Sequence, residues 1–328
     1  MFSMNYNLLF KKSGKNSKFF YYSKNVLRLM VPSFFYSKNL QSALNKVDQR
    51  KDKEYIFERV NYYNKLDKHI PLPLDSKSLR EHTLKGERSV YFFDTREYTR
   101  WFAPDLKWQH IAGDVKDLVP YPTIVKARPI VPNNQNSVLL NLNKVRHFIF
   151  INDTKPYTDK ISKALFRGET DSKSNRQLFV NMFHDHPLCN AGDIGHDVKT
   201  LHAEKMTIYQ HLDYKFILCL EGNDVASNLK WVMSSNSIAV MPLPSRETWF
   251  MEGRLIPNYH FIAIKADYSD FLERINYYID HPEEALEIIK HAHEFVDQFK
   301  DKKREKLISL LVLNKYFNYF VKYYTVHL

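Results

Sequence analysis

Two arginines in the second half of the chain stand where they could bind phosphate. Arg167 follows directly on an apolar run from Lys163 that predicts a strand, and Arg176 stands at the head of a helix predicted over residues 176–183. Guanidinium groups bind phosphate oxygens bidentately, and a helix N-terminus contributes free N–H groups beside them. The pair therefore suits a diphosphate, although two ordinary surface arginines would show the same spacing.

A second polar cluster follows the next predicted strand. The apolar runs 216–220 and 238–241 predict two strands, and residues 225–234 between them predict an amphipathic helix. A unit of this length is typical of a parallel sheet, in which ligands bind beyond the carboxyl ends of the strands. The polar residues at that end are Glu221, Gly222, Asn223, Asp224, Ser227, Asn228 and Lys230.

These residues have the chemistry of a sugar-phosphate site. A carboxylate such as Glu221 or Asp224 accepts the paired hydroxyls of a ribose or hexose. Ser227, Asn228 and Lys230 fall in the first helical turns, where their side chains can meet phosphate oxygens. Taken singly, Asp224 fits an N-cap and Lys230 a solvated helix position, but together behind one strand these residues predict a ligand site.

The first half offers carboxylates for proton transfer. The run 89–93 predicts a strand that is followed by Asp94 and, three residues later, Glu97. A carboxylate that faces a cleft between two domains can take the proton of an acceptor hydroxyl as a general base. Capping and ion pairing with Arg96 or Arg100 is the alternative interpretation of both residues.

Lys126 and Arg128, in the segment PTIVKARPI, suit an acceptor phosphate and a neighbouring helix end equally well. No Asp-x-Asp motif occurs, so the carboxylate pair that commonly holds a divalent ion on a nucleotide-sugar diphosphate is not visible. The Gly-rich dinucleotide fingerprint and the P-loop are also absent from the sequence. We therefore expect no metal site and no cofactor.

The elements that must position these residues follow an α/β pattern. The chain has 328 residues, of which 44 % are hydrophobic, enough for two globular domains with cores of their own. Strands that alternate with helices in the second half predict an α/β domain. Further strands are predicted at 108–111, 123–125, 147–151 and near His260, and further helices at 53–66, 201–210, 269–279, 283–299 and 302–324.

The net charge of +11 is concentrated at the N-terminus. Residues 1–47 hold eight Lys or Arg and no Asp or Glu, and they are rich in Phe and Tyr. This composition suits an anionic surface, either lipid headgroups or nucleic acid, and equally an arm that packs on its own protein. With two cysteines, no apolar run of about 20 residues and no signal peptide, we expect a cytoplasmic protein.

Several segments together resemble a known family. They include FRG at 166–168, the block 214–242, ETWFMEG at 247–253 and LISLLVLNKYF in the tail. These segments are similar to glycosyltransferase family 90, the lipopolysaccharide-modifying and capsule-associated family that also contains eukaryotic protein O-glucosyltransferases. The bacterial lipopolysaccharide branch is matched more closely, through VYFFDTREY, GDV, PTIVKARPI, SVLLNLNKVRHF and DHPLC. The resemblance runs from residue 89 to the C-terminus.

The resemblance implies two Rossmann-like domains that face a cleft, the GT-B-type architecture, with long C-terminal helices. It divides the chain into a basic aromatic arm (1–52), an acceptor-binding domain (53–155), a domain for the UDP-sugar (156–300) and a helix that packs back on the first domain (301–328). The implied reaction is metal-independent and inverting: a hexose moves to a lipopolysaccharide or lipooligosaccharide core at the cytoplasmic face of the inner membrane. The arm would touch anionic lipid.

The resemblance also implies roles for residues. Arg167, Gly168 and Arg176 become ligands of the diphosphate in place of a metal ion. The base of the eukaryotic branch is an Asp after an Arg at a strand end; the match here is Glu97 after its arginine, and Asp94 is equally placed. Asn228 stands where the eukaryotic branch has an Arg. Two alternatives stay open: a protein O-glycosyltransferase acting on Ser or Thr, and a non-enzymatic basic protein that binds nucleic acid.

Overall fold

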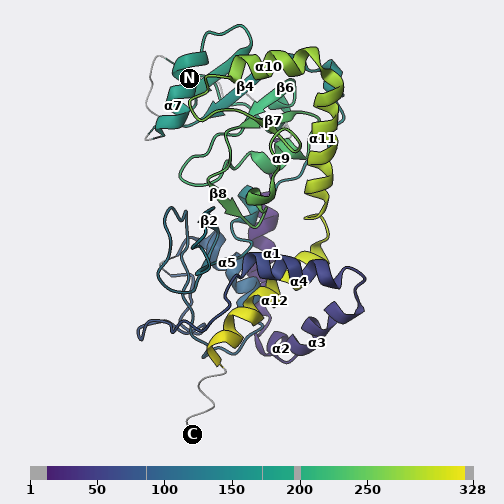
Figure 1. Ribbon diagram of the computed structural model, residues 1–328. Helices are drawn as coiled ribbons and strands as arrows, with labels where there is room; N and C mark the ends of the chain where they lie inside the picture. Colours follow the sequence, from purple (N-terminus) through teal and green to yellow (C-terminus); the bar gives the residue numbers. More distant parts are fainter. Residues whose placement is uncertain (1–12, 86, 172, 196–200, 322–328) are drawn as a thin grey trace, which may run out of the picture.

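The apolar runs of the second half form one five-stranded parallel sheet in the order β5-β4-β6-β7-β9. Its strands are β4 (Ile161–Gly168), β5 (Cys189–Asp193), β6 (Tyr214–Leu218), β7 (Ile238–Met241) and β9 (Ile262–Ala263). The computed structural model describes residues 13–85, 87–171, 173–195 and 201–321 (Figure 1). The strands predicted around 163–167, 216–220, 238–241 and His260 are confirmed, because short apolar runs are what a strand buried on both faces requires.

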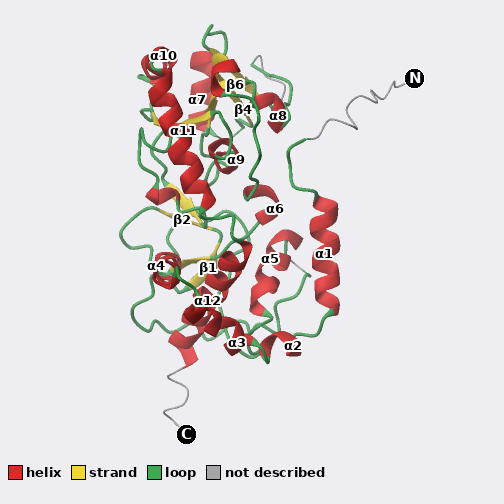
Figure 2. Ribbon diagram, turned by 90° about the vertical axis from the view of Figure 1, so that its right-hand side faces the viewer, coloured by secondary structure: helices red, strands yellow, loops and turns green. Residues whose placement is uncertain are grey.

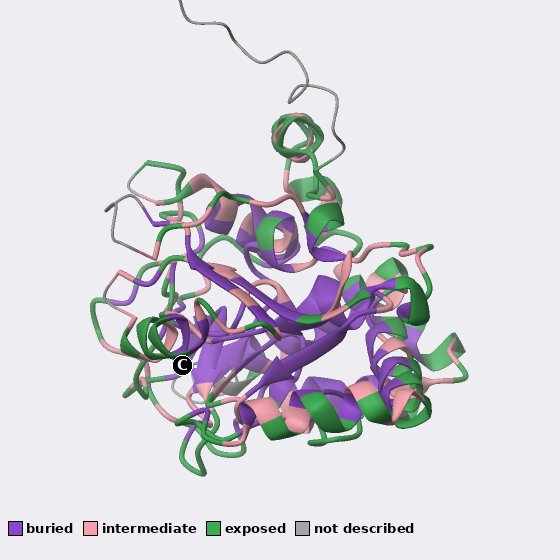
Figure 3. Cartoon of the chain, turned by 90° about the horizontal axis from the view of Figure 1, so that it is seen from above, coloured by how far each residue is buried: buried purple, intermediate pink, exposed green. Residues whose placement is uncertain are grey.

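Helices cover both faces of this sheet, whose strands are buried at the centre of the view from above (Figure 3). α7 (Ser174–Phe183) and α10 (Phe271–Asp280) pack on one face, where Phe179 and Phe271 share a core with Phe216. α9 (Leu229–Met233) belongs to the core on the other face, with Ile217 of β6. The side chains of β6 therefore alternate between two cores, as a strand period of two requires.

Two long helices follow the sheet: one runs from the upper lobe of Figure 1 towards the lower lobe, and the next lies within the lower lobe. α11 (Pro282–Asp297) begins in the core around the sheet and ends in the core that continues into the first half of the chain. α12 (Lys302–Val321) packs against α3 (Leu40–Leu44), α4 (Lys53–Tyr63) and α5 (Ser89–Thr99). Within that interface Arg59 Nη1 lies 2.5 Å from Glu305 Oε1, and Trp249 Nε1 donates to Glu305 Oε2 at 2.6 Å.

The first half contains little sheet in the described residues. β1 (Thr123–Val125) pairs in parallel with β3 (Ser137–Leu139), while β2 (Ala127–Pro129) pairs antiparallel with β8 (Arg246–Thr248) of the second half. The chain is thus α/β, with one large parallel sheet and a second lobe built mainly from helices. The remaining elements are α1 (Lys18–Met30), α2 (Phe34–Ser37), η2 (Asn45–Gln49), α6 (Lys144–His147), η3 (Tyr157–Asp159), α8 (Ile208–His211) and η4 (Glu252–Arg254).

Some predicted elements are wrong. Residues 89–93 are the first turns of helix α5, not a strand: an aromatic run that is buried nearly all round satisfies either element. Only α8 is helical in the segment 201–210, and residues 148–151 follow α6 without regular structure. Within 108–111 the chain forms a single bridge, between His110 and Ile124, rather than a strand.

The basic arm forms a surface helix where it is described. The hydroxyl of Ser17 accepts a hydrogen bond from the N–H of Phe20 and caps α1, which lies beside α5 (Figure 2). Residues 1–12 of the predicted arm lie outside the described residues. Of the helices that the structure describes, none has the length and apolar character needed to cross a bilayer.

Candidate functional site

The carboxyl ends of β6 and β7 open on a cavity of about 210 Å³. Glu221 and Leu243, in the loops after these strands, line it together with Asn175 of α7 and with Tyr268. Parallel strands bring their carboxyl ends to one edge of the sheet, which is where folds of this kind bind ligands. The cavity therefore lies where the sequence predicted a site.

Arg176 binds the backbone of two residues that line this cavity. Its guanidinium donates to the carbonyls of Leu220 (2.9 Å), Glu221 (3.1 Å) and Glu169 (3.3 Å). A Cβ on Gly222 would lie 3.0 Å from Arg176 Nη2, so a side chain there would press on the guanidinium. Burial lowers the pKa of Arg176 from its ordinary value, and the charge of Glu169 opposes this effect.

Arg167 lies on the other side of the sheet. Phe166 packs on Phe179 of α7, so the next side chain along the strand points to the opposite face. There Arg167 donates to the carbonyl of Asn190 at 2.8 Å and to its amide oxygen at 2.7 Å. Gly168 ends the strand, where a Cβ would lie 2.7 Å from the ring of Phe166. The structure does not bring the two predicted arginines into contact, and a joint role for them stays a prediction.

Side-chain hydrogen bonds hold the loop after β6 at both of its ends. The carboxylate of Glu221 accepts from the backbone N–H of Ser245 at 3.0 Å and from its hydroxyl at 2.5 Å. Asn228 donates its amide to the carbonyl of Leu218 at 2.9 Å. These contacts fix the backbone around the cavity. The other two predicted residues of the loop are Asn223, which is exposed, and Ser227, which is half-buried.

Asp224 contacts the first half of the chain. Lys126 Nζ lies 2.5 Å from Asp224 Oδ2 and donates to Asp114 Oδ1 at 2.7 Å, so one ammonium bridges two carboxylates. Burial raises the pKa of Asp224 despite this ammonium. Burial alone would also raise the pKa of Asp114, but the hydrogen bond and charge of Lys126, with smaller contributions from Asp224 and Arg146, together leave that pKa below its usual value. Asp114, with 34 % of its side chain exposed, is the carboxylate of the pair that solvent reaches.

Two other predicted ligands are buried in ion pairs. Lys230 Nζ lies 2.5 Å from Glu252 Oε1, with 0 % and 1 % of the two side chains exposed. Arg128 Nε lies 2.7 Å from Glu247 Oε1, with 0 % and 3 % exposed. The first pair fixes α9 on η4 and the second fixes β2 on β8. Neither cation lines the cavity, whereas Glu252 does.

The two predicted bases lie beneath the N-terminal helix. The hydroxyl of Tyr21 donates to Asp94 Oδ1 at 2.8 Å, and Arg28 Nη2 lies 2.9 Å from Glu97 Oε1. Lys144 Nζ lies 2.5 Å from Glu97 Oε2. Burial raises the pKa of Asp94. For Glu97 the charges of Lys144 and Arg28 outweigh the effect of burial and lower the pKa to about 2.

Arg146 is a cation that the sequence analysis did not single out. It lies on the short helix α6, is exposed, and its side chain makes no hydrogen bond or ion pair with any described residue. Its charge helps to lower the pKa of Asp114, and adds to burial in lowering that of Arg176, so it lies between the two halves. Burial and the charges of Arg146 and two lysines hold the pKa of neighbouring His147 well below its usual value. The sequence contains a signal for this residue: Arg146 lies in NKVRH, a basic run within one of the segments that resemble the family.

Tyr268 is a second residue that pattern reasoning missed. Its backbone has φ 62°, a left-handed conformation that is uncommon for a bulky residue. The hydroxyl donates to the carbonyl of Asn175 at 3.0 Å, and burial raises the pKa of Tyr268 to about 12. Backbone strain of this kind clusters at binding sites, and here it places an aromatic ring on the cavity wall.

One group of side chains has the geometry of a cation site. His82, Glu87 and His110 bring three ligand atoms within 4.8 Å of one another, the one such group among the described residues. His82 Nε2 is already 2.6 Å from Glu87 Oε2, and burial lowers the pKa of His110 to about 3. This group lies beside Trp108, on which the ring of His110 stacks, and no residue of it lines the cavity.

Comparison with known proteins places these features in a family. The model of "Glycosyl transferase family 90" matches residues 137–324. The chain is 37 % identical over 302 residues to O-glucosyltransferase LpsA of Dichelobacter nodosus, covering 91 % of this chain and 94 % of that protein. It is 26 % identical over 168 residues to Protein O-glucosyltransferase 3 of Homo sapiens, covering 49 % of this chain and 32 % of the human one. Protein O-glucosyltransferase 2 of Danio rerio is 28 % identical over 145 residues, 42 % of this chain and 28 % of that protein.

Proposed function

Because this chain belongs to glycosyltransferase family 90 and is therefore a glycosyltransferase, we propose that it transfers a hexose from a UDP-sugar to a lipopolysaccharide or lipooligosaccharide core. The relatives named above are O-glucosyltransferases, which supports glucose as the hexose. The lipopolysaccharide acceptor rests on the resemblance of the first half to the bacterial branch. We place the reaction at the cytoplasmic face of the inner membrane, in a GT-B-type arrangement of two lobes around a cleft.

The observation that carries the proposal is a pair of cations beside the cavity. Arg176 donates to the carbonyls of Leu220 and Glu221, which line the cavity with Tyr268, and Arg146 is close enough for its charge to affect the pKa of Arg176. A uridine in the cavity would place its diphosphate against these cations. Transfer to the acceptor leaves the diphosphate with an additional negative charge. Because this charge develops in the transition state, fixed cations stabilise the transition state more than the ground state. We therefore propose that Arg146 and Arg176 supply the charge stabilisation and that the reaction needs no metal ion.

We propose Asp114 as the general base. It lies at the boundary of the two halves, its carboxylate is partly exposed, and Lys126 keeps it ionised and oriented. In the step, Asp114 takes the proton of the acceptor hydroxyl while the oxygen attacks the anomeric carbon. The bond to the UDP oxygen breaks on the opposite side, UDP departs with the electron pair, and the configuration inverts. Asp94 and Glu97, the bases expected from the sequence, lie under α1 instead and remain the competing candidates.

The test is a donor and acceptor panel. Purified protein is incubated with UDP-glucose, UDP-galactose and UDP-N-acetylglucosamine, with and without a truncated lipooligosaccharide, and released UDP is measured. The proposal predicts UDP release that requires UDP-glucose and rises with the lipooligosaccharide, and an inverted anomeric linkage by NMR. Transfer to a Ser- or Thr-containing peptide, with none to the lipooligosaccharide, would show that the acceptor is a protein and not a lipooligosaccharide.

The alternative acceptor has one observation behind it. The eukaryotic relatives that the chain matches are named protein O-glucosyltransferases. The match covers less than half of this chain, whereas the bacterial relative covers 91 % of it. A non-enzymatic nucleic-acid-binding protein is wrong as an interpretation of the chain, since membership of the family makes it an enzyme.

A further inference from the structure

Helix α1 has its apolar side turned outward. Its contacts with α5 include two polar ones, Tyr21 with Asp94 and Arg28 with Glu97, and one between the rings of Tyr22 and Phe93. Its buried residue is Asn25. A surface helix normally places its apolar stripe against the core. The outward side chains continue from α1 into α2 and are large and apolar: Phe19 (74 % exposed), Phe20 (72 %), Leu27 (64 %), Met30 (75 %), Phe34 (64 %) and Phe35 (58 %).

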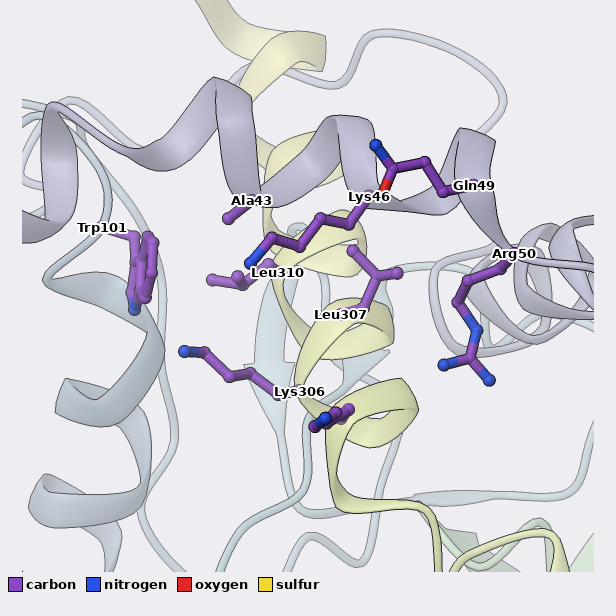
Figure 4. Close-up of a pocket in the computed structure, with 9 residues that line it drawn as sticks. Ala43, Lys46, Gln49, Arg50, Trp101, Lys306, Leu307 and Leu310 are labelled. Atoms are coloured by element: carbon purple, nitrogen blue, oxygen red, sulfur yellow. The ribbon is translucent and has the colours of Figure 1, made fainter.

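A groove begins at the end of this apolar surface. One part, of about 350 Å³, is lined by Val31 and Phe35, and the next part, of about 430 Å³, runs between η2 and the first turns of α12. The two parts share Lys46, Trp101 and Lys306, so they form one continuous groove. Figure 4 shows Lys46 and Lys306 reaching into it towards Trp101.

The inner end of the groove is cationic. Lys46, Lys303 and Lys306 line it, and none of the three makes an ion pair with a described residue. Arg50 lines it too, but is paired with Asp52 at 2.6 Å. Lys306 Nζ lies 4.4 Å from the centroid of the Trp101 ring. Burial lowers the pKa of Lys306; the charge of Glu97 opposes this effect and that of Lys46 adds to it. An anion between these ammonium groups would offset their repulsion.

The groove thus matches a molecule that is anionic at one end and apolar at the other. We propose that it binds the headgroup of an anionic phospholipid, with the exposed apolar side chains of α1 and α2 inserted at the surface of the same bilayer. Charge complementarity favours this occupant: residues 1–47 contain no Asp or Glu to repel an anionic membrane. Apolar side chains flanked by lysines are the composition of helices that lie in a membrane interface. None of the residues that line the groove lines the cavity at the sheet edge.

The inference deepens the proposed function, on which it rests for the identity of the acceptor as a membrane lipid, but its test needs no transfer. The measurement is co-sedimentation with vesicles of phosphatidylcholine alone and of phosphatidylcholine with 30 mol % phosphatidylglycerol. Wild-type protein should bind the anionic vesicles at least about tenfold more tightly, with an affinity that falls as salt rises. The triple variant Lys46→Gln, Lys303→Gln, Lys306→Gln should lose roughly 100-fold, because each basic residue at an anionic surface contributes about fivefold.

Matched controls separate the groove from net charge. Lys77→Gln, Lys163→Gln, Lys265→Gln removes the same charge from exposed lysines outside the groove, and should change vesicle affinity by less than about threefold. Phe34→Ser with Phe35→Ser should weaken binding to the anionic vesicles, whereas the fully exposed Leu74→Ser should not. Both groove variants should still release UDP from UDP-glucose in detergent solution, which distinguishes a lost membrane contact from a lost active site.

Three results would overturn the inference. Equal binding of wild-type protein to the two kinds of vesicle would exclude an anionic headgroup as the ligand. Equal affinity of the triple lysine variant of the groove and of its control variant would exclude the groove as the binding site. Binding of soluble glycerol phosphate, seen as a change in Trp fluorescence, without any vesicle binding would assign the groove to a free phosphate instead.

Discussion

Lys126 Nζ lies 2.5 Å from Asp224 Oδ2, across the boundary between the two halves of the chain. The sequence suggested that one of these residues binds the acceptor and the other the donor. In the structure they bind each other, and the same ammonium holds Asp114 at 2.7 Å. The ion pair thus joins the two halves of the chain and also positions Asp114, the proposed base.

Asp114→Asn should remove the base without removing the donor site. We expect kcat to fall by about 10²–10⁴-fold, the usual contribution of general base catalysis, while the Kd for UDP stays unchanged. Asp94→Asn and Glu97→Gln serve as the matched carboxylates under α1. Should Glu97→Gln or Asp94→Asn lose transfer while Asp114→Asn keeps it, the base belongs to α5 and the sequence expectation was right.

Arg146→Ala and Arg176→Ala should each weaken UDP binding by roughly 10–100-fold, the value of one charge-assisted hydrogen bond. Arg176→Lys should restore little, because a lysine cannot reproduce the bidentate fork. Calorimetric titration with UDP measures the effect. Arg80→Ala, an exposed arginine with 68 % of its side chain in solvent, is the control and should bind UDP like the wild type. Arg167→Ala tests the residue on the other side of the sheet; a loss equal to that of Arg176→Ala would show that both arginines reach the diphosphate.

Removal of divalent metal should leave transfer intact. Protein dialysed against EDTA and assayed in metal-free buffer is expected to release UDP at the wild-type rate, because guanidinium groups supply the stabilising charge. The same assay tests whether a metal ion bound by the cluster of His82, Glu87 and His110 contributes to transfer. Activity that disappears with EDTA and returns with added Mg²⁺ or Mn²⁺ would contradict the proposed mechanism.

The pair formed by Glu97 with Lys144 and Arg28 should make stability depend on acid pH. Those charges hold the pKa of Glu97 at about 2, below the 4.5 of an unperturbed glutamate. A carboxyl whose pKa is lower in the folded state stabilises the protein above its unfolded pKa, and this contribution is lost as the pH falls through 4.5 towards 2. Urea unfolding of wild type and Glu97→Gln should therefore differ by on the order of 3 kcal/mol at pH 7, a difference that shrinks across this window. The exposed Glu273→Gln should show no such difference.

Glu252→Gln should destabilise the fold. It leaves Lys230 buried with no opposite charge, which costs about 3–5 kcal/mol in the free energy of unfolding. Glu287→Gln breaks the exposed pair with Lys290 and should cost at most about 1 kcal/mol. Urea denaturation measures both. If the double variant Lys230→Met with Glu252→Leu restores the stability lost by Glu252→Gln, the loss in the free energy of unfolding comes from the unpaired charge of Lys230 and not from other contacts of Glu252.

The sequence by itself determined the sheet and the edge at which the cavity lies. β6 and β7 are short apolar runs, each followed by polar or proline-rich residues, and this local pattern suffices because a strand buried on both faces tolerates few polar side chains. The family followed from the order of such segments. The same local reasoning failed at α5, where an aromatic run buried nearly all round has no period to distinguish helix from strand.

Only the tertiary structure decided which charges meet. Lys126 and Asp224 are far apart in the chain, and an ion pair leaves no periodic trace in either segment. Likewise the sequence indicates a solvated helix position for Lys230, whereas in the structure the turn after β8 places Glu252 against it as a buried partner. The outward apolar side of α1 was equally hidden, because composition shows that a helix is amphipathic but not which side the protein covers. Burial and pairing are set by long-range packing, and packing assigned these side chains their roles.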